Sequence, residues 1–158
     1  MKNLPPFLII LYKKLNMKNC GIKRETANKL LDELIERVKT NNGSLDLEKH
    51  PRFITKIYLF GSLLNSNKDK VGDIDLFVKT VTKFKSEKEE RMFFLKHPNN
   101  KSSSYLKRLS FALDKTLTFI RSKQPAFSFS GEMDYDFLVT EKHVPVKLIF
   151  EDDSFLKY

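Results

Sequence analysis

Two short motifs in the central third of the chain carry residue types suited to phosphate and metal chemistry. Gly61-Ser62 follows the apolar run 57–60. Ten residues after Ser62, Gly72 precedes Asp73 and Asp75, which begin a second apolar run. Side chains alternate faces along a strand, so the two aspartates are predicted on one face. Paired carboxylates suit Mg²⁺, which binds oxygen ligands and often substrate phosphates. Glycine permits close approach of the backbone to a ligand, and a serine hydroxyl with nearby amides can contact phosphate oxygens. The pattern indicates metal-assisted chemistry on a nucleoside triphosphate.

The Gly-Ser pair, the polar loop and the Asp-hydrophobic-Asp strand resemble the signature of the DNA polymerase β-like nucleotidyltransferase superfamily, whose small bacterial members include minimal and antibiotic nucleotidyltransferases. The resemblance implies that Gly61 and Ser62 bind the triphosphate of an NTP, with ATP preferred. It implies that Asp73 and Asp75 hold two catalytic Mg²⁺ ions together with a third carboxylate from a neighbouring strand. The implied reaction moves an NMP onto an acceptor hydroxyl of a protein, an RNA or a small molecule.

The loop between the two motifs adds positive charge. Lys68 and Lys70 are candidates for nucleotide binding through phosphate contacts, although loop lysines are more commonly solvated. Residues 63–65 read Leu-Leu-Asn, where the more familiar family members carry a small residue and an arginine. The substrate subgroup is therefore left open.

The position of the third carboxylate has two interpretations. The strand that best matches the family position, 146–150, carries Lys147 at its centre, and a protonated lysine cannot ligate Mg²⁺. In the first interpretation Asp136, which lies between two aromatic residues, completes the metal site or serves as the general base. In the second, Lys147 replaces the carboxylate and pairs with Asp73 or Asp75, so that the fold remains and metal catalysis is lost. The pattern favours Asp136.

The second interpretation leads to a different class of function. A catalytically degenerate nucleotidyltransferase-like domain would act as a module that binds a protein or a nucleic acid. The formal net charge of +9 is compatible with a polyanionic partner such as RNA. Small stand-alone members of the superfamily often resemble the antitoxin half of a toxin–antitoxin pair, so the resemblance also implies a protein partner.

Length and composition predict one globular domain. The chain has 158 residues, of which 41% are hydrophobic and 31% are charged, as in ordinary soluble proteins. A single cysteine, Cys20, excludes an internal disulfide and fits a reducing compartment. The apolar run 7–12 is too short to span a bilayer. We expect an N-terminal extension over 1–21, a single nucleotidyltransferase-like domain over 22–158, a cytoplasmic location and no membrane contact.

Periodicity predicts an α+β fold. Apolar residues at helical spacing predict a helix over 22–38, a short helix that begins after Ser86, and a long helix over 105–122; alternation predicts strands over 53–60, 73–78 and 127–129, and a hairpin of 135–140 with 144–150. This order gives a palm-like mixed sheet of about five strands, with helices packed mainly on one face.

Overall fold

The computed structural model describes residues 21–97 and 105–157. The expectation of an N-terminal extension over 1–21 therefore concerns, apart from Gly21, residues outside the described part. Among the described residues, no helix combines the length and the apolar character needed to cross a membrane.

Six strands and seven helical segments make up the described chain. They are β1 (Ile22–Lys23), α2 (Arg24–Asn41), β2 (Arg52–Phe60), α3 (Ser62–Asn65), β3 (Lys70–Val71), β4 (Ile74–Thr82), α4 (Glu87–Lys96), α5 (Tyr105–Arg121), β5 (Phe127–Ser130), α6 (Glu132–Tyr135), the π-helix η2 (Asp136–Glu141), β6 (Lys147–Glu151) and the 3-10 helix η3 (Ser154–Lys157). The main sheet has the strand order β5-β4-β2-β6, and β1 pairs with β3 in a separate two-stranded sheet. The β4–β5 pair is parallel and the others are antiparallel, so the predicted mixed α+β fold is confirmed.

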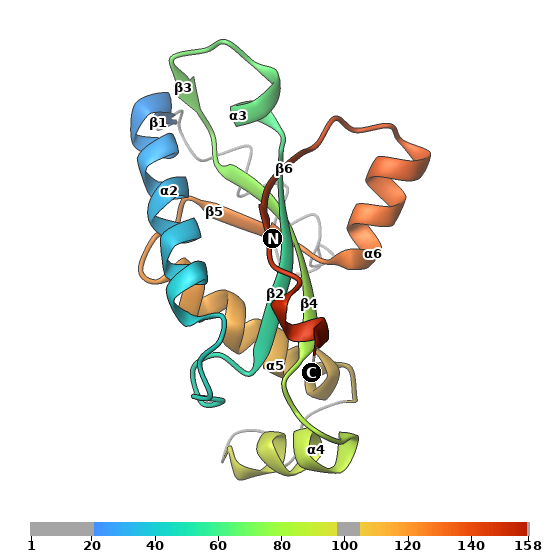
Figure 1. Cartoon of the computed structure of the whole chain (residues 1–158). Coiled ribbons are helices and arrows are strands. Elements are labelled where there is room, and N and C mark those ends of the chain that lie inside the picture. Colours follow the sequence, from blue (N-terminus) through green and yellow to red (C-terminus); the bar gives the residue numbers. More distant parts are fainter. Residues whose placement is uncertain (1–20, 98–104, 158) are drawn as a thin grey trace, which may run out of the picture.

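The hydrophobic core lies between the main sheet and the helices α2 and α5. In Figure 1, α2 lies to the left of the strands and α5 runs diagonally across their lower end. Ala27 and Leu34 of α2 and Ile120 of α5 are fully buried, as are Ile57 of β2 and Leu76 of β4. The predicted amphipathic helices therefore exist because each buries one apolar stripe against the sheet.

The opposite face of the sheet is covered by α6, on the right in Figure 1. Tyr135 at the end of α6 packs its ring on Tyr58 of β2, with centroids 4.7 Å apart, and edge-on to Phe77 of β4 at 5.4 Å. The hairpin predicted from 135–140 and 144–150 is wrong in its first half, because 132–141 is helical. β6 alone joins the sheet, beside β2.

The predicted start of α4 is confirmed in its details. The Ser86 hydroxyl accepts a hydrogen bond from the Glu89 amide at 3.2 Å, and the Glu89 carboxylate accepts one from the Lys85 amide at 2.7 Å. These two bonds satisfy amides that the first turn of a helix leaves without partners.

Candidate functional site

The turn after β2 lies directly against a carboxylate of β4. Phe60, the last residue of β2, pairs with Asp75 in the antiparallel register, which brings Gly61 beside the same aspartate. Gly61 has φ +74° and ψ −153°, a conformation that belongs essentially to glycine. A Cβ atom at this position would lie 3.0 Å from Cγ and 3.2 Å from Cβ of Asp75 and would overlap its Oδ2. The two sequence motifs therefore lie side by side.

Asp73 and Asp75 project from the start of β4 away from the core. The residues beside them, Ile74 and Leu76, are fully buried, whereas both aspartates are partly exposed. The Ile74 amide donates to the Ala126 carbonyl at 2.8 Å, which fixes the start of the strand next to β5. Since alternate residues share a face, the carboxylates lie on the side opposite the core. Two carboxylates at a strand end are oxygen donors of the type that a hard divalent cation requires.

Ser62 begins the single helical turn α3 directly after Gly61. The amides of Leu64 and Asn65 both donate to the Gly61 carbonyl, at 3.2 and 3.0 Å, and the Ser66 hydroxyl donates to the Ser62 carbonyl at 2.9 Å. These bonds hold the turn in one conformation. The amides at the start of a helical turn have no acceptor within it, so they can serve an anion.

This geometry agrees with a comparison with known protein families. Residues 31–125 match the family model described as the nucleotidyltransferase domain. The chain belongs to the nucleotidyltransferase domain family. Comparisons with curated proteins and with solved structures gave no match. The resemblance drawn from the two motifs is thereby confirmed, and the family's general activity is nucleotidyl transfer with an NTP and a divalent metal.

The matched part of the nucleotidyltransferase domain contains both motifs and ends before the two candidates for the third carboxylate position. Asp136 is exposed and begins η2. Lys147 is exposed and lies opposite Leu59 in the β2–β6 register, so it is on the other face of the sheet from Asp75. Over the part of the chain that the structure describes, no three His, Cys, Asp or Glu side chains gather in a group that could hold a metal ion.

Arg24, which the sequence analysis did not single out, fastens the loop of the nucleotidyltransferase motif. Its guanidinium donates to the carbonyl oxygens of Leu63 at 2.7 Å and Lys68 at 3.1 Å, and also to that of Ser66. Its own amide donates to the Asp69 carbonyl at 2.8 Å. One side chain at the first position of α2 thus fixes the loop 63–69. No sequence signal marks it, because three of its acceptors are main-chain oxygens about forty residues away and the fourth is the Ser66 hydroxyl.

The two loop lysines lie within or next to this fastened segment. Lys68 provides one of the carbonyls that Arg24 binds, and Lys70 belongs to β3, where it pairs with Lys23 of β1. Both side chains are exposed. Their backbone is therefore held in place while their ammonium groups reach into solvent. Contact of either lysine with a phosphate stays a prediction.

Proposed function

We propose that this chain is a Mg²⁺-dependent nucleotidyltransferase that transfers an NMP from an NTP, preferably ATP, to an acceptor hydroxyl. The observation that supports this most directly is the close approach of Gly61 to the Asp75 carboxylate. A phosphate-binding turn and a metal-binding carboxylate must lie side by side in such an enzyme, because the metal bridges protein oxygens and substrate phosphate.

Each motif residue has a defined role in this proposal. Asp73 and Asp75 would hold the divalent metal, whose charge would stabilise the negative charge that develops on the phosphoryl group. Ser62, with the amides at the start of α3, would bind the triphosphate, and Lys68 or Lys70 would add positive charge near it. Gly61 leaves room for the carboxylate, and Arg24 keeps the loop in register.

Asp136 would serve on the acceptor side of the site, as the third carboxylate or as the base that removes the acceptor proton. Tyr135 is fixed on Tyr58 and Phe77. Phe77 lies two residues beyond Asp75 on β4, so it shares its face with the aspartate. The segment that carries Asp136 therefore covers the same face of the sheet as the metal-binding pair, which supports this assignment.

The proposal also includes the class of molecule that accepts the NMP. We place the acceptor hydroxyl on a protein or RNA partner in the cytoplasm, in a toxin–antitoxin or defence pair. The net charge of +9 and the family resemblance support this choice over a neutral small molecule.

A second candidate function is a degenerate domain that binds a partner without catalysis. The observation in its favour is that no third His, Cys, Asp or Glu of the described residues joins two others in a group that could hold a metal ion. In this alternative the domain would bind nucleic acid or protein through its basic surface, and nucleotide binding would not depend on metal.

Calorimetric titration of the full chain with ATP, GTP, CTP and UTP, with and without Mg²⁺, distinguishes the two functions. The enzyme predicts metal-dependent binding that Asp73→Asn or Asp75→Asn abolishes. Asp114→Asn is the matched control, because it removes the same charge from an exposed position on α5. Label transfer from α-³²P-ATP to the chain itself or to added RNA would then identify the acceptor class. Absence of nucleotide binding at millimolar concentration would contradict the enzyme.

A further inference from the structure

A cavity of about 500 Å³ lies at the other end of the sheet from the nucleotidyltransferase site. Phe53 at the start of β2 and Lys83 just after β4 both line it, whereas Gly61 follows the end of β2. The stretch of β2 from Phe53 to Phe60 corresponds to roughly 23 Å of strand. Figure 1 shows this separation, with α3 and β3 at the upper end and α4 at the lower end. A ligand in the cavity would therefore not overlap with bound nucleotide.

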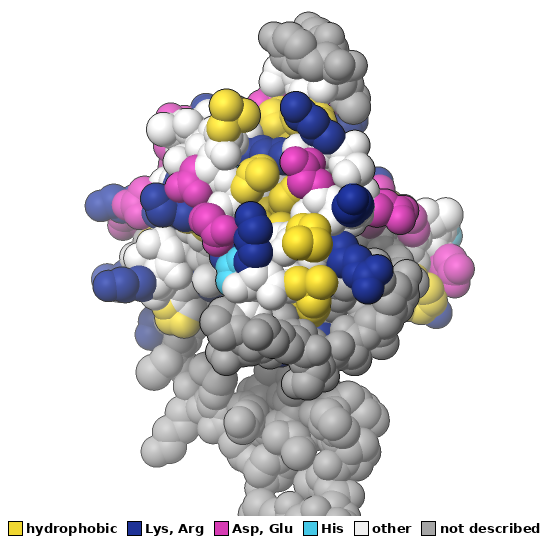
Figure 2. All heavy atoms as spheres, turned by 90° about the horizontal axis from the view of Figure 1, so that it is seen from below, with side chains coloured by type: hydrophobic (Ala, Val, Ile, Leu, Met, Phe, Trp, Pro, Cys, Tyr) yellow, Lys and Arg dark blue, Asp and Glu magenta, His cyan; other side chains and the backbone are white. Residues whose placement is uncertain are grey.

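Apolar side chains form much of the cavity wall. Phe53 is buried and stacks on Phe155, with ring centroids 4.9 Å apart, and Leu47 adds a half-buried side chain. Leu45, which also lines the cavity, is 93% exposed. A side chain of this kind gains stability when a ligand covers it. Figure 2, which views the molecule from this lower end, shows hydrophobic side chains at the centre of the face between Lys, Arg, Asp and Glu.

Lys83 brings a cation to this apolar wall. Its half-buried ammonium group donates to the Ser44 carbonyl at 2.8 Å and to His50 Nδ1 at 3.2 Å. Within residues 21–97 and 105–157 it forms no ion pair, and Asp46 acts on its charge only from a longer distance. Burial lowers the pKa of Lys83 to about 8, so the ammonium form still predominates at neutral pH. An ammonium has three N–H donors, and two of them are used.

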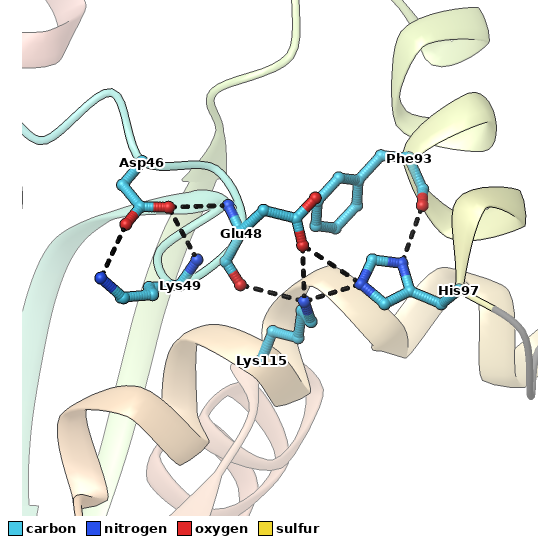
Figure 3. A network of polar contacts seen from close by, with 6 residues as sticks. All are labelled: Asp46, Glu48, Lys49, Phe93, His97 and Lys115. Atoms are coloured by element: carbon cyan, nitrogen blue, oxygen red, sulfur yellow. Dashed lines mark hydrogen bonds and ion pairs between the residues drawn. The ribbon is translucent and has the colours of Figure 1, made fainter.

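The cavity wall is held in place before any ligand arrives. Figure 3 shows Glu48 in the loop that follows Leu47: its carboxylate contacts Lys115 Nζ of α5 at 3.1 Å and His97 Nε2 at 3.2 Å. The Glu48 carbonyl accepts a further bond from Lys115 at 2.9 Å. On the cavity side, Asn42 is buried and exchanges two hydrogen bonds of 2.8 Å with the backbone of Ile54. Ligand pockets are usually preformed in this way.

We propose that this cavity binds a small organic carboxylate with an aromatic or hydrocarbon body, its carboxylate on Lys83 Nζ and its body against Phe53 and Phe155. The chemistry follows from one half-buried cation, Lys83, in an apolar wall, because this cation can neutralise one negative charge. Of the other charged residues in the lining, Lys85 is exposed and Glu89 is negative, so a phosphate with two charges would be matched less well. The volume lies within the range of sites for small molecules.

The test uses 2-naphthoate and its neutral analogue 2-naphthamide as probes of the full chain, with calorimetry and ¹H–¹⁵N spectra as readouts. We expect naphthoate to bind at least about tenfold more tightly than the amide, since the charge-assisted bond is lost with the amide. The shifted amide signals should be those of Leu45, Leu47, Phe53 and Phe155.

Two variants test the assigned contacts. Lys83→Met should weaken naphthoate binding at least about tenfold and leave naphthamide binding unchanged. Lys88→Met, an exposed position on α4 outside the cavity lining, is the matched control. If Lys83→Met fails to fold, Leu45→Glu provides the second test. Leu45 is almost fully exposed, so the variant should fold, and a carboxylate there should weaken naphthoate binding by repulsion. Equal binding of the two probes, or signal shifts confined to Gly61 and Asp75, would overturn the proposal.

Discussion

Gly61 and Asp75 are packed so closely that no side chain fits between them. A Cβ at Gly61 would overlap the Asp75 carboxylate, and the backbone there has the positive φ that glycine tolerates. Position 61 in the first motif therefore requires glycine, because Asp75 of the second motif occupies the space that a side chain would need. The two motifs, which are separate in the sequence, are therefore in direct steric contact in the fold.

Gly61→Ala should disrupt this site. The added methyl group would push the Asp75 carboxylate from its position, and the backbone conformation would cost about 1–3 kcal/mol. We expect loss of metal-dependent ATP binding by calorimetry, together with a lower free energy of unfolding in urea. Gly72→Ala is the matched control, since a Cβ at Gly72 meets nothing within 4 Å even though it precedes Asp73 directly. Equal nucleotide affinity of the two variants would show that the close approach has no functional role.

Arg24→Gln should loosen the loop of the nucleotidyltransferase motif. The substitution removes guanidinium bonds to three carbonyl oxygens, two of which, those of Leu63 and Ser66, are partly buried. The free energy of unfolding should fall by about 1–3 kcal/mol. Nucleotide affinity should fall roughly tenfold to a hundredfold, because a displaced loop no longer positions the phosphates. Urea titration and calorimetry measure the two effects.

The control for Arg24 is Arg91→Gln, which removes a guanidinium from an exposed position on α4. It should change neither stability nor affinity. A loss of stability in Arg24→Gln without any change in nucleotide affinity would contradict a positioning role and leave Arg24 a purely structural residue.

Asp136→Asn and Lys147→Met separate the two interpretations of the third carboxylate. If Asp136 acts in the reaction, replacing its carboxylate by the side-chain amide of Asn should lower the rate of NMP transfer by about 10²- to 10⁴-fold. Lys147→Met should leave transfer and metal-dependent binding unchanged, since Lys147 lies on the other face of the sheet from Asp75. Rates are measured with labelled ATP at saturating nucleotide. Full activity of Asp136→Asn would show that another residue acts as the general base.

The sequence predicted those parts of the fold in which local pattern and tertiary packing agree. The helices over α2 and α5, the strand β2 and the Ser86–Glu89 cap all have local signals that the structure confirms. The Gly-Ser and Asp-X-Asp motifs lie side by side, since a Cβ at Gly61 would meet Asp75, and the roles predicted for their residues stay predictions. Family membership followed from the same residues.

Other features depend on contacts that no local pattern encodes. The alternation over 135–140 indicated a strand, but Tyr135 packs on Tyr58 and Phe77 across the sheet and the segment is helical. Arg24 acts mainly on main-chain oxygens of a distant loop, so most of its acceptors have no side-chain signature. Tertiary contacts determine the structure in both cases. Such contacts are also the common reason why predictions of short strands fail.

His50 should make the stability of the protein depend on pH between 6.5 and 4. The side chain is buried, and burial followed by the charge of Lys83 lowers the pKa of His50 to about 4. Below pH 6.5 the unfolded chain binds a proton at this site while the folded chain does not. The free energy of unfolding therefore falls as the pH is lowered through this window, by about 3 kcal/mol in total. Urea titrations at intervals of half a pH unit measure the slope.

His50→Asn should remove most of that slope above pH 4.5, because its side-chain oxygen can still accept the bond from Lys83 without titrating. The lowered pKa values of Asp46, Glu48 and Asp152 affect stability mainly below this range, so they do not obscure the comparison. His143→Asn is the matched control: His143 is exposed, and its φ of 53° is one that asparagine tolerates. A slope that survives in His50→Asn but disappears in His143→Asn would show that the buried histidine does not govern the acid sensitivity.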